Sequence, residues 1–129
     1  MKRRVLIVED NLPSCELLRD WLEVEGFEVW TAADLKSSLE ALANGLPDVV
    51  LLDINLGHED GLFVVERMRQ EPTMRGIPVI AVTAHAKVTE QQRVLQAGCK
   101  ACLSKPIDFT VLRDHLDHWL YAAERTPDV

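Results

Sequence analysis

Short, largely apolar runs alternate along the chain with segments in which apolar residues recur every three or four positions. The runs lie at Val5–Val8, Phe27–Thr31, Asp48–Asp53, Ile77–Val82 and Ala101–Ser104. Runs of this length and composition are typical of strands that are buried on both faces. The pattern therefore predicts five short strands.

The segments between and after these runs have the periodicity of amphipathic helices. They are expected from Asn11 to Gly26, from Asp34 to Asn44-Gly45, from Leu62 to Glu71-Pro72, from Val88 to Ala97, and onward from Asp108. Asn11, Asp34 and Asp108 are residue types that cap helix N-termini, and Pro13 suits a first turn. The first helix is predicted to turn Leu17, Leu18, Trp21 and Leu22 inward, the second Leu35, Leu39 and Leu42, and the last Phe109, Leu112, Leu116 and Trp119 or Leu120.

Five strand–helix units predict an α/β fold, a doubly wound parallel sheet of five strands flanked by five helices. In such sheets, ligands bind beyond the carboxyl ends of the strands. The residues that directly follow each apolar run are therefore the first candidates for a functional site.

Composition and charge narrow the class of protein. The chain has 129 residues, 47% hydrophobic and 27% charged, which fits one globular domain over residues 1–123 with a short polar tail over 124–129. No apolar run approaches the roughly 20 residues that cross a membrane, and the basic start is followed by too short an apolar run for a signal peptide. The three cysteines do not indicate a disulfide framework. These features predict a cytoplasmic protein, and the net charge of -7 disfavours direct contact with nucleic acid.

Polar side chains follow four of the predicted strands. Glu9 and Asp10 follow the first, Asp53 ends the third, Thr83 follows the fourth, and Lys105 follows the fifth. Because the strands are parallel, three carboxylates, a hydroxyl and an ammonium group are expected at one edge of the sheet. Carboxylates at close range repel one another, and a hard divalent cation such as Mg²⁺ relieves that repulsion. Asp53 could then attack a phosphoryl group, with Lys105 neutralising charge and Thr83 donating a hydrogen bond.

The sequence resembles the receiver domains of two-component response regulators. The resemblance rests on VLIVEDN (5–11), DVVLLDINL (48–56), VIAVTA (79–84) and LSKPI (103–107), and it extends from Arg4 to Tyr121. It implies a flavodoxin-like sheet in the order 2-1-3-4-5, and phosphoryl transfer from a phosphohistidine on a histidine kinase or phosphotransfer protein. Residue by residue, it implies Asp53 as the phosphoacceptor, Glu9 and Asp10 as the acidic pair for Mg²⁺, the backbone carbonyl of Asn55 as a further metal ligand, Thr83 as the switch hydroxyl, Lys105 as the phosphate-binding lysine, and Pro106 as a residue that often follows a cis bond.

Two positions depart from the family pattern. Cys102 stands where the family commonly has a Tyr or Phe that moves with the switch threonine, so the usual aromatic readout is in doubt. Gly57 stands where a proline is common, and it predicts a more mobile loop from Gly57 to Gly61. Asn55 and His85 occupy positions that tune access of water to the acyl phosphate, so we hypothesise that they set its lifetime.

The expected protein accepts and hydrolyses its own phosphoryl group and is not a turnover enzyme on a separate substrate. A downstream protein is expected on the face of the fourth helix, fifth strand and fifth helix, including Leu95, Cys102 and Ser104. The phosphodonor is expected on the first helix near Pro13 and Cys15. A homodimer is left open.

Several alternatives stay open at this point. The chain could be a receiver excised from a hybrid histidine kinase or longer regulator, although Met1 and the polar tail favour a standalone protein. A flavin-binding protein would need a phosphate loop where the chain has the acidic Glu9-Asp10. A hydrolase that forms an aspartyl phosphate often has Asp where Asn55 lies. Cys99 with Cys102, and His115 with His118, have metal-like or redox-like spacing but lie in contexts that favour a structural role.

Overall fold

The computed structural model describes residues 2–121, so the predicted tail over 124–129 and the domain limit at residue 123 lie outside the described residues. In chain order the elements are β1 (Arg4–Val8), α1 (Leu12–Val24), β2 (Glu28–Ala32), α2 (Leu35–Asn44), β3 (Val49–Asp53), β4 (Asn55–Leu56), β5 (Glu59–Asp60), α3 (Leu62–Gln70), β6 (Val79–Thr83), α4 (Val88–Ala97), β7 (Ala101–Ser104) and α5 (Phe109–Tyr121). Each helix within these residues is too short or too polar to cross a membrane.

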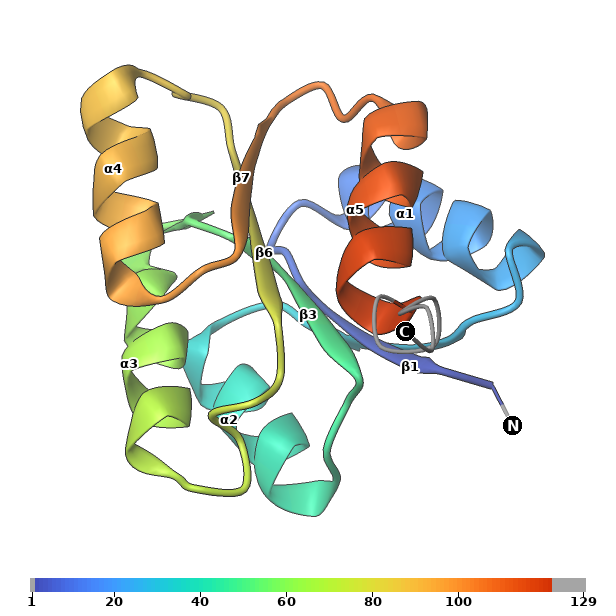
Figure 1. Cartoon of the computed structure of the whole chain (residues 1–129), viewed down its shortest axis with the longest axis horizontal. Coiled ribbons are helices and arrows are strands. Elements are labelled where there is room, and N and C mark those ends of the chain that lie inside the picture. Colours follow the sequence, from blue (N-terminus) through green and yellow to red (C-terminus); the bar gives the residue numbers. More distant parts are fainter. Residues whose placement is uncertain (1, 122–129) are drawn as a thin grey trace, which may run out of the picture.

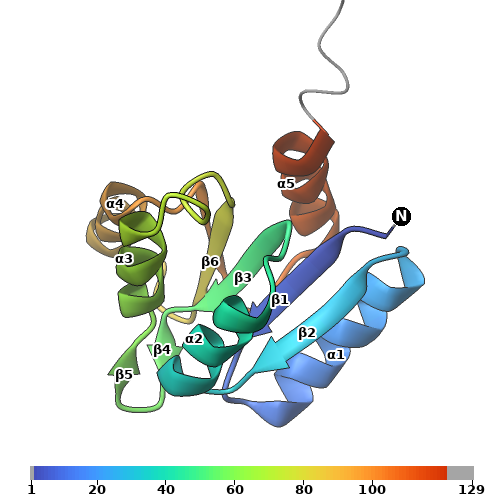
Figure 2. The same cartoon turned by 90° about the horizontal axis from the view of Figure 1, so that it is seen from below.

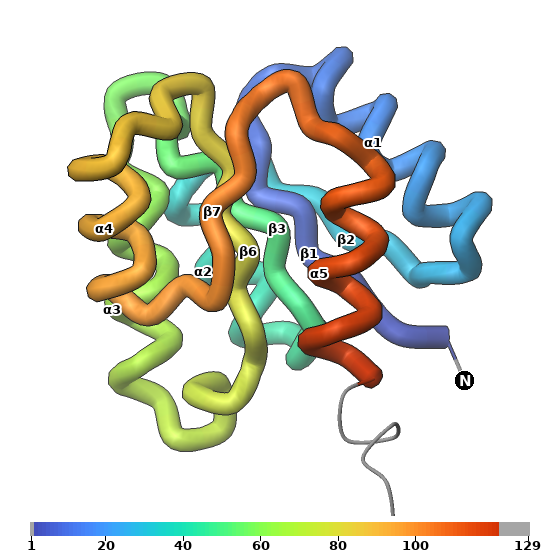
Figure 3. The backbone as a smooth tube through the Cα atoms, turned by 45° about the horizontal axis from the view of Figure 1, so that its top comes forward, coloured from blue at the N-terminus to red at the C-terminus, as the bar shows by residue number. Residues whose placement is uncertain are grey.

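Five parallel strands form one sheet in the order β2-β1-β3-β6-β7 (Figure 1). Counted along the chain without the short β4 and β5, this order is 2-1-3-4-5, so the predicted fold is confirmed. The α1 and α5 helices cover one face of the sheet, and α2, α3 and α4 cover the other. The connections that follow β1, β3, β6 and β7 gather at one end of the sheet (Figure 3).

The core consists of two apolar layers, one on each face of the sheet. Residues of one strand alternate between the layers, as Leu6 and Val8 pack toward α2 and α3 while Val5 and Ile7 pack toward α1 and α5. The four residues Val5–Val8 of β1 are each at most 1% exposed. A strand buried this deeply holds the residue at its end in a fixed position, which matters for the site below.

Three helices, α1, α2 and α5, begin directly after the predicted capping residues. The side chain of Asn11 accepts a hydrogen bond from Ser14 N, and Asp34 forms a reciprocal capping box with Ser37. Asp108 Oδ1 accepts from Thr110 N at 2.9 Å, so the third predicted cap is confirmed as well. These side chains satisfy backbone N–H groups that have no partner within the helix.

Leu17 was predicted to face inward, and that prediction is wrong. Its side chain is 60% exposed, whereas Cys15, Leu18 and Leu22 form the buried stripe of α1. Positions 15, 18 and 22 are spaced three and four apart, and position 17 lies about 100° away from Leu18 on the helix surface. The exposed leucine therefore belongs to a surface rather than to the core.

The β4–β5 hairpin is an element that the apolar pattern did not predict. Asn55 pairs with Asp60 and Leu56 with Glu59, and the two-residue turn between them contains Gly57 at a φ of 60°. Glycine at the first position of a two-residue hairpin loop is a recognised turn signal. The flanking strands are only two residues long and mostly polar, so they lack the alternation that would reveal a strand. Figure 2 shows the hairpin beyond the end of β3.

Candidate functional site

The sheet places five of the predicted site residues at one edge: Glu9, Asp10, Asp53, Thr83 and Lys105. Backbone hydrogen bonds extend past the strand ends: Glu9 N donates to Ala32 O, Ile54 N to Val82 O, and Lys105 N to Thr83 O. These bonds fix the backbone at Glu9 and Lys105 and directly after Asp53. The predicted convergence of strand ends is therefore confirmed as a matter of geometry.

Lys105 links two of the carboxylates. Its Nζ donates to Glu9 Oε1 at 2.8 Å and to Asp53 Oδ2 at 2.9 Å. Both carboxylates are buried, with side chains 5% exposed, and the lysine is partly buried. Hydrogen bonds between charged groups at these distances are among the stronger ones in proteins. The peptide bond from Lys105 to Pro106 is cis, as the family resemblance implied.

The charges of this cluster change one another's protonation. Burial raises the pKa of Glu9 to about 7, and the hydrogen bond to Asp53 adds to the rise while Lys105 opposes it. Burial lowers the pKa of Lys105, but its hydrogen bonds to Asp53 and Glu9 outweigh that effect and leave the pKa above its ordinary value. Lys105 is therefore a stable positive charge at the centre of the acidic edge.

Glu9, Asp10 and Asp53 form a group that fits a divalent cation. One oxygen from each carboxylate lies within 4.8 Å of the others, and no other such group of three occurs among residues 2–121. Glu9 Oε2 is buried and has no hydrogen-bond partner. A buried carboxylate oxygen without a partner is costly, and a hard cation with its bound water satisfies it. The donor set is therefore suited to Mg²⁺.

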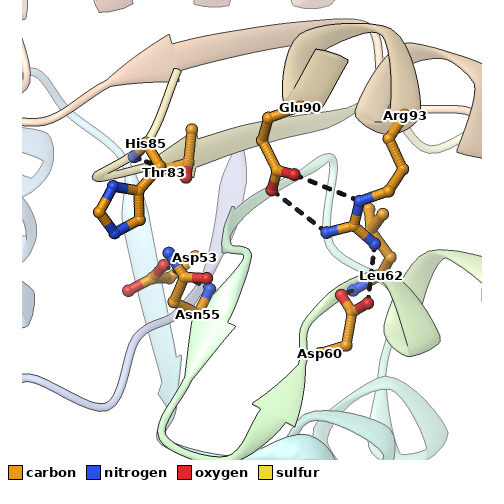
Figure 4. A network of polar contacts seen from close by, with 8 residues as sticks. All are labelled: Asp53, Asn55, Asp60, Leu62, Thr83, His85, Glu90 and Arg93. Carbon is orange, nitrogen blue, oxygen red and sulfur yellow. Dashed lines mark hydrogen bonds and ion pairs between the residues drawn. The ribbon is translucent and has the colours of Figure 1, made fainter. Parts of the chain in front are cut away.

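Thr83 ends β6, the strand beside β3, and is fully buried. Its Oγ1 accepts a hydrogen bond from His85 N at 3.1 Å. A hydroxyl that accepts this bond keeps its own proton to donate elsewhere. Figure 4 shows Thr83 and His85 above Asp53 and Asn55 in that view.

Asn55 starts the hairpin directly beyond Asp53. Its backbone N donates to Asp53 Oδ1 at 2.9 Å, and its side chain is exposed. At the other end of the hairpin, Gly61 lies so close to Asp53 that a Cβ there would be 2.4 Å from the Asp53 carbonyl oxygen. Sequence reasoning missed this role of Gly61, because the close approach exists only once the hairpin folds back.

A cavity of about 410 Å³ opens beside the site. Its walls are largely apolar and come from α1, from β1, β3 and β6, and from the segment that leads from β7 into α5. Glu9, Asp53 and Lys105 line one part of it. The remaining wall includes Leu17, Leu18, Pro106, Ile107 and Phe109. The exposed Leu17 is thus part of the wall of a cavity that reaches the acidic edge.

Other candidate residues lie away from this edge or are buried. Cys15, predicted on the phosphodonor surface, is buried in the core, so only its exposed neighbour Pro13 is available there. Cys99 is buried as well, and burial raises the pKa of its thiol to about 12, which is the opposite of a reactive thiol. On the predicted downstream face, Leu95 and Ser104 are exposed and Cys102 is partly buried.

The fold, together with the acidic residues and the lysine at one edge of its sheet, is typical of one family of proteins. The chain matches the family model of the response regulator receiver domain over residues 5–117. It therefore belongs to the response regulator receiver family, whose members interact with histidine kinases or phosphotransfer proteins.

Individual relatives agree with this assignment. The chain is 39% identical over 107 residues to the polar-differentiation response regulator DivK of Brucella anthropi, covering 83% of this chain and 87% of that relative. The same figures hold for DivK of Brucella ovis. Both matches therefore extend across most of this chain and most of the relative.

Two solved structures extend the comparison to three dimensions. The CheY-like receiver domain protein of Methanospirillum hungatei is 28% identical with a TM-score of 0.87, over 98% of this chain and 100% of that one. The receiver domain of a sensor histidine kinase from Pseudomonas aeruginosa is 28% identical with a TM-score of 0.84, over 93% of this chain and 98% of that one. That second structure has a magnesium ion coordinated in its active site cleft.

Proposed function

We propose that the protein accepts a phosphoryl group on Asp53 in an Mg²⁺-dependent transfer from a phosphohistidine. The observation that supports this most directly is the position of Lys105. Its ammonium group bridges Asp53 and Glu9 in a chain of the receiver family, at the edge where three carboxylates meet. This is the charge arrangement that transfer of an anionic group to an anionic acceptor requires.

Four groups would hold the metal: the carboxylates of Glu9, Asp10 and Asp53 and the backbone carbonyl of Asn55. The partnerless Glu9 Oε2 and the closeness of the three acids support this assignment. When bound, Mg²⁺ would supply positive charge to the phosphoryl oxygens. Glu9 and Asp10 do not react themselves, and their role is to hold that charge beside Asp53.

The transfer balances as a single displacement at phosphorus. An oxygen of the Asp53 carboxylate forms the new P–O bond, and the P–N bond to the donor imidazole breaks. The electron pair of that bond stays with the imidazole nitrogen. Lys105 shifts its hydrogen bond from the Asp53 carboxylate to a phosphoryl oxygen, and the Thr83 hydroxyl donates to another.

The phosphoryl group would be released by hydrolysis of the acyl phosphate. Each phosphoryl group that Asp53 accepts would be hydrolysed once. We propose that Asn55, which follows β3, and His85, which follows β6, control how water reaches the acyl phosphate. Substituting each by Ala should change the first-order rate of loss of the adduct, measured by intact-mass spectrometry after the donor is removed. An unchanged rate in both variants would remove this assignment.

The phosphodonor would approach over α1 and the cavity beside it. The exposed Leu17 lines that cavity together with Asp53 and Lys105, so an apolar side chain of a donor protein can enter next to the reacting group. Leu17→Ser should slow transfer from a phosphotransfer protein while leaving transfer from a small phosphodonor unchanged. Equal rates from the protein donor in both forms would place the docking surface elsewhere.

The downstream partner, or a second copy in a homodimer, would use α4, β7 and α5, where Leu95 and Ser104 are exposed. Partners of this kind fit a location in the cytoplasm.

The hydrolase alternative makes a different prediction, namely continued turnover of a phosphorylated substrate instead of one phosphoryl group per chain. The flavin alternative predicts a coloured purified protein.

Intact-mass spectrometry tests the proposal. Wild type and Asp53→Asn are incubated with a small phosphodonor, with Mg²⁺ and with a chelator. We expect one labile phosphoryl adduct on wild type with Mg²⁺ and none in the other three samples. An adduct of equal yield on Asp53→Asn would assign the acceptor to another residue.

A further inference from the structure

The β4–β5 hairpin and the glycine that follows it lie directly against the acidic edge. Asn55 N donates to Asp53 Oδ1, and Gly61 packs against the Asp53 carbonyl at a distance that leaves no room for a Cβ. At the turn, Gly57 lies near Asp10, since a Cβ added to the glycine would come within 3.8 Å of Asp10 Oδ2. A displacement of the hairpin therefore moves the surroundings of both acids.

The opposite side of the hairpin is bonded to three helices. Glu59 Oε1 accepts from Leu35 N at the start of α2, at 3.0 Å. Asp60 Oδ1 accepts from Leu62 N at the start of α3, also at 3.0 Å. Asp60 Oδ2 accepts from Arg93 Nη1 on α4 at 2.8 Å. Figure 4 shows the carboxylate of Asp60 between the start of α3 and the guanidinium of Arg93.

The α4 helix is held by few contacts. Val94 is its one buried residue, and its N-cap Lys87 makes no side-chain capping bond. At its C-terminal end, Ala97 O accepts from Arg69 Nη1 of α3 at 2.9 Å. Nearer its N-terminus, Arg93 joins Glu90 of the same helix to Asp60 of the hairpin. The bond between Arg93 and Asp60 therefore ties the middle of α4 to the hairpin that begins with Asn55.

We propose that the β4–β5 hairpin couples the acidic edge to α4, and that Asp60 and Arg93 are the positioning pair of this coupling. The inference rests on the proposed function, because it assigns the hairpin the task of presenting the Asn55 backbone to the bound metal. A ligand that fixes Asn55 also fixes Asp60, five residues further on and paired with it across the hairpin. Arg93 then holds α4 against the hairpin.

Coupling between two sites is reciprocal. If a ligand at the acidic edge strengthens the bond between Asp60 and Arg93, then that bond must strengthen binding of the ligand by the same factor. Ion pairs with this degree of exposure have modest energies, so we expect a factor of about two to five in affinity.

Arg93→Gln separates positioning from long-range electrostatics. Removing a positive charge near a cation site raises the affinity for Mg²⁺ if Coulomb attraction alone acts, whereas loss of positioning lowers it. Isothermal titration of the full chain with MgCl₂ is expected to show about two- to fivefold weaker binding in Arg93→Gln than in wild type. Arg69→Gln is the matched control, because it removes the bond from α3 to the C-terminal end of α4 and also one positive charge, but leaves the bond between the hairpin and α4 intact.

Amide hydrogen exchange gives the second readout. In wild type, Mg²⁺ is expected to slow exchange in residues 88–97, and this effect should be lost in Arg93→Gln and retained in Arg69→Gln.

The double variant Asp60→Asn with Arg93→Gln should bind Mg²⁺ no more weakly than Asp60→Asn alone. Unchanged or tighter Mg²⁺ binding by Arg93→Gln, with wild type binding normally, would overturn the coupling and leave the proposed function standing. A wild type that binds no Mg²⁺ would overturn both.

Discussion

Gly61 is a residue on which the geometry of the site depends. Its φ is -57°, which any residue adopts, so the requirement for glycine comes from space alone. A Cβ at this position would lie 2.4 Å from the Asp53 carbonyl oxygen and 3.1 Å from Ile54 Cα. Because both neighbours are backbone atoms, we expect Gly61→Ala to lower the free energy of unfolding by about 1–3 kcal/mol, measured by urea denaturation.

Gly76→Ala is the control for this substitution. A Cβ on Gly76 would meet nothing within 4 Å. Restricting the unfolded chain at such a position stabilises a protein by about 0.4–1 kcal/mol. Equal stability of the two alanine variants would contradict the account of Gly61.

Cys99 gives a prediction for alkaline pH. Burial, with a smaller contribution from Cys102, raises the pKa of its thiol from 9.0 to about 12. Between these values the unfolded chain has released the proton and the folded protein has kept it. The free energy of unfolding is therefore unaffected by this group below pH 9 and falls above it, with a slope that approaches about 1.4 kcal/mol per pH unit.

Urea denaturation of wild type and Cys99→Ser over this pH range isolates the thiol, since serine does not titrate there. The slope of stability against pH above about pH 9 should be shallower in the variant, whatever its absolute stability. Parallel slopes in the two proteins would mean that the thiol ionises equally in the folded and unfolded states.

At the residue scale, the roles that depend on neighbouring residues in the sequence were predictable. Asn11, Asp34 and Asp108 could be predicted as caps because capping depends on the next three residues only. Lys105 could be placed because it directly follows a buried strand. The bond of Arg93 to Asp60 spans 33 positions in the chain, and no local pattern signals a contact of that kind.

At the scale of elements, the start of α2 shows how local bonds fix a helix. Asp34 Oδ1 accepts a hydrogen bond from Ser37 N at 2.7 Å, and Asp34 N donates one to Ser37 Oγ at 3.2 Å. The Ser37 hydroxyl, which donates to Asp34 Oδ1 at 2.6 Å, and after it the Ser37 N–H hold the pKa of Asp34 below its ordinary value. We expect Asp34→Ala to lower the free energy of unfolding by about 1 kcal/mol, measured by urea denaturation.

Lys36→Ala, an exposed substitution in the same turn, is the reference and should change stability by less than about 0.5 kcal/mol. If both variants unfolded at the same urea concentration, the capping box would contribute nothing to the fold.

The elements themselves were predictable to different degrees. The strands and helices with apolar faces were found within one or two residues of their true ends, because burial on a regular period leaves a clear pattern. The β4–β5 hairpin has two residues in each strand and is held by side-chain bonds to Leu35 N and Arg93. Its existence depends on helices that are distant in sequence, so its polar residues looked like a loop. The predicted mobility of that loop stays a prediction.

At the scale of the whole molecule, the parallel sheet brings like charges together at one edge. Three carboxylates within 4.8 Å destabilise the fold unless a cation or Lys105 offsets them. A ligand that binds the folded state alone stabilises it by about 2.7 kcal/mol at one hundred times its dissociation constant. Mg²⁺ should therefore raise the melting temperature of wild type in a concentration-dependent manner.

Asp10→Asn tests the repulsion among the three carboxylates by removing one of the charges instead of adding a cation. Removing one of the three charges should make the metal-free protein more stable than wild type and should reduce the increment that Mg²⁺ gives. Thermal unfolding with Mg²⁺ and with a chelator measures both effects. A variant that is less stable without metal, or an equal increment with it, would mean that Asp10 does not belong to the site.

The position of the phosphoryl group is the most direct test of the account. Wild type is loaded with a small phosphodonor and Mg²⁺ and is then reduced with borohydride, which converts an aspartyl phosphate to homoserine. Peptide mass spectrometry then locates the converted residue. The account predicts homoserine at position 53 and nowhere else in the chain. Conversion at Asp10 instead, or a phosphoryl group retained on a histidine or serine, would contradict it.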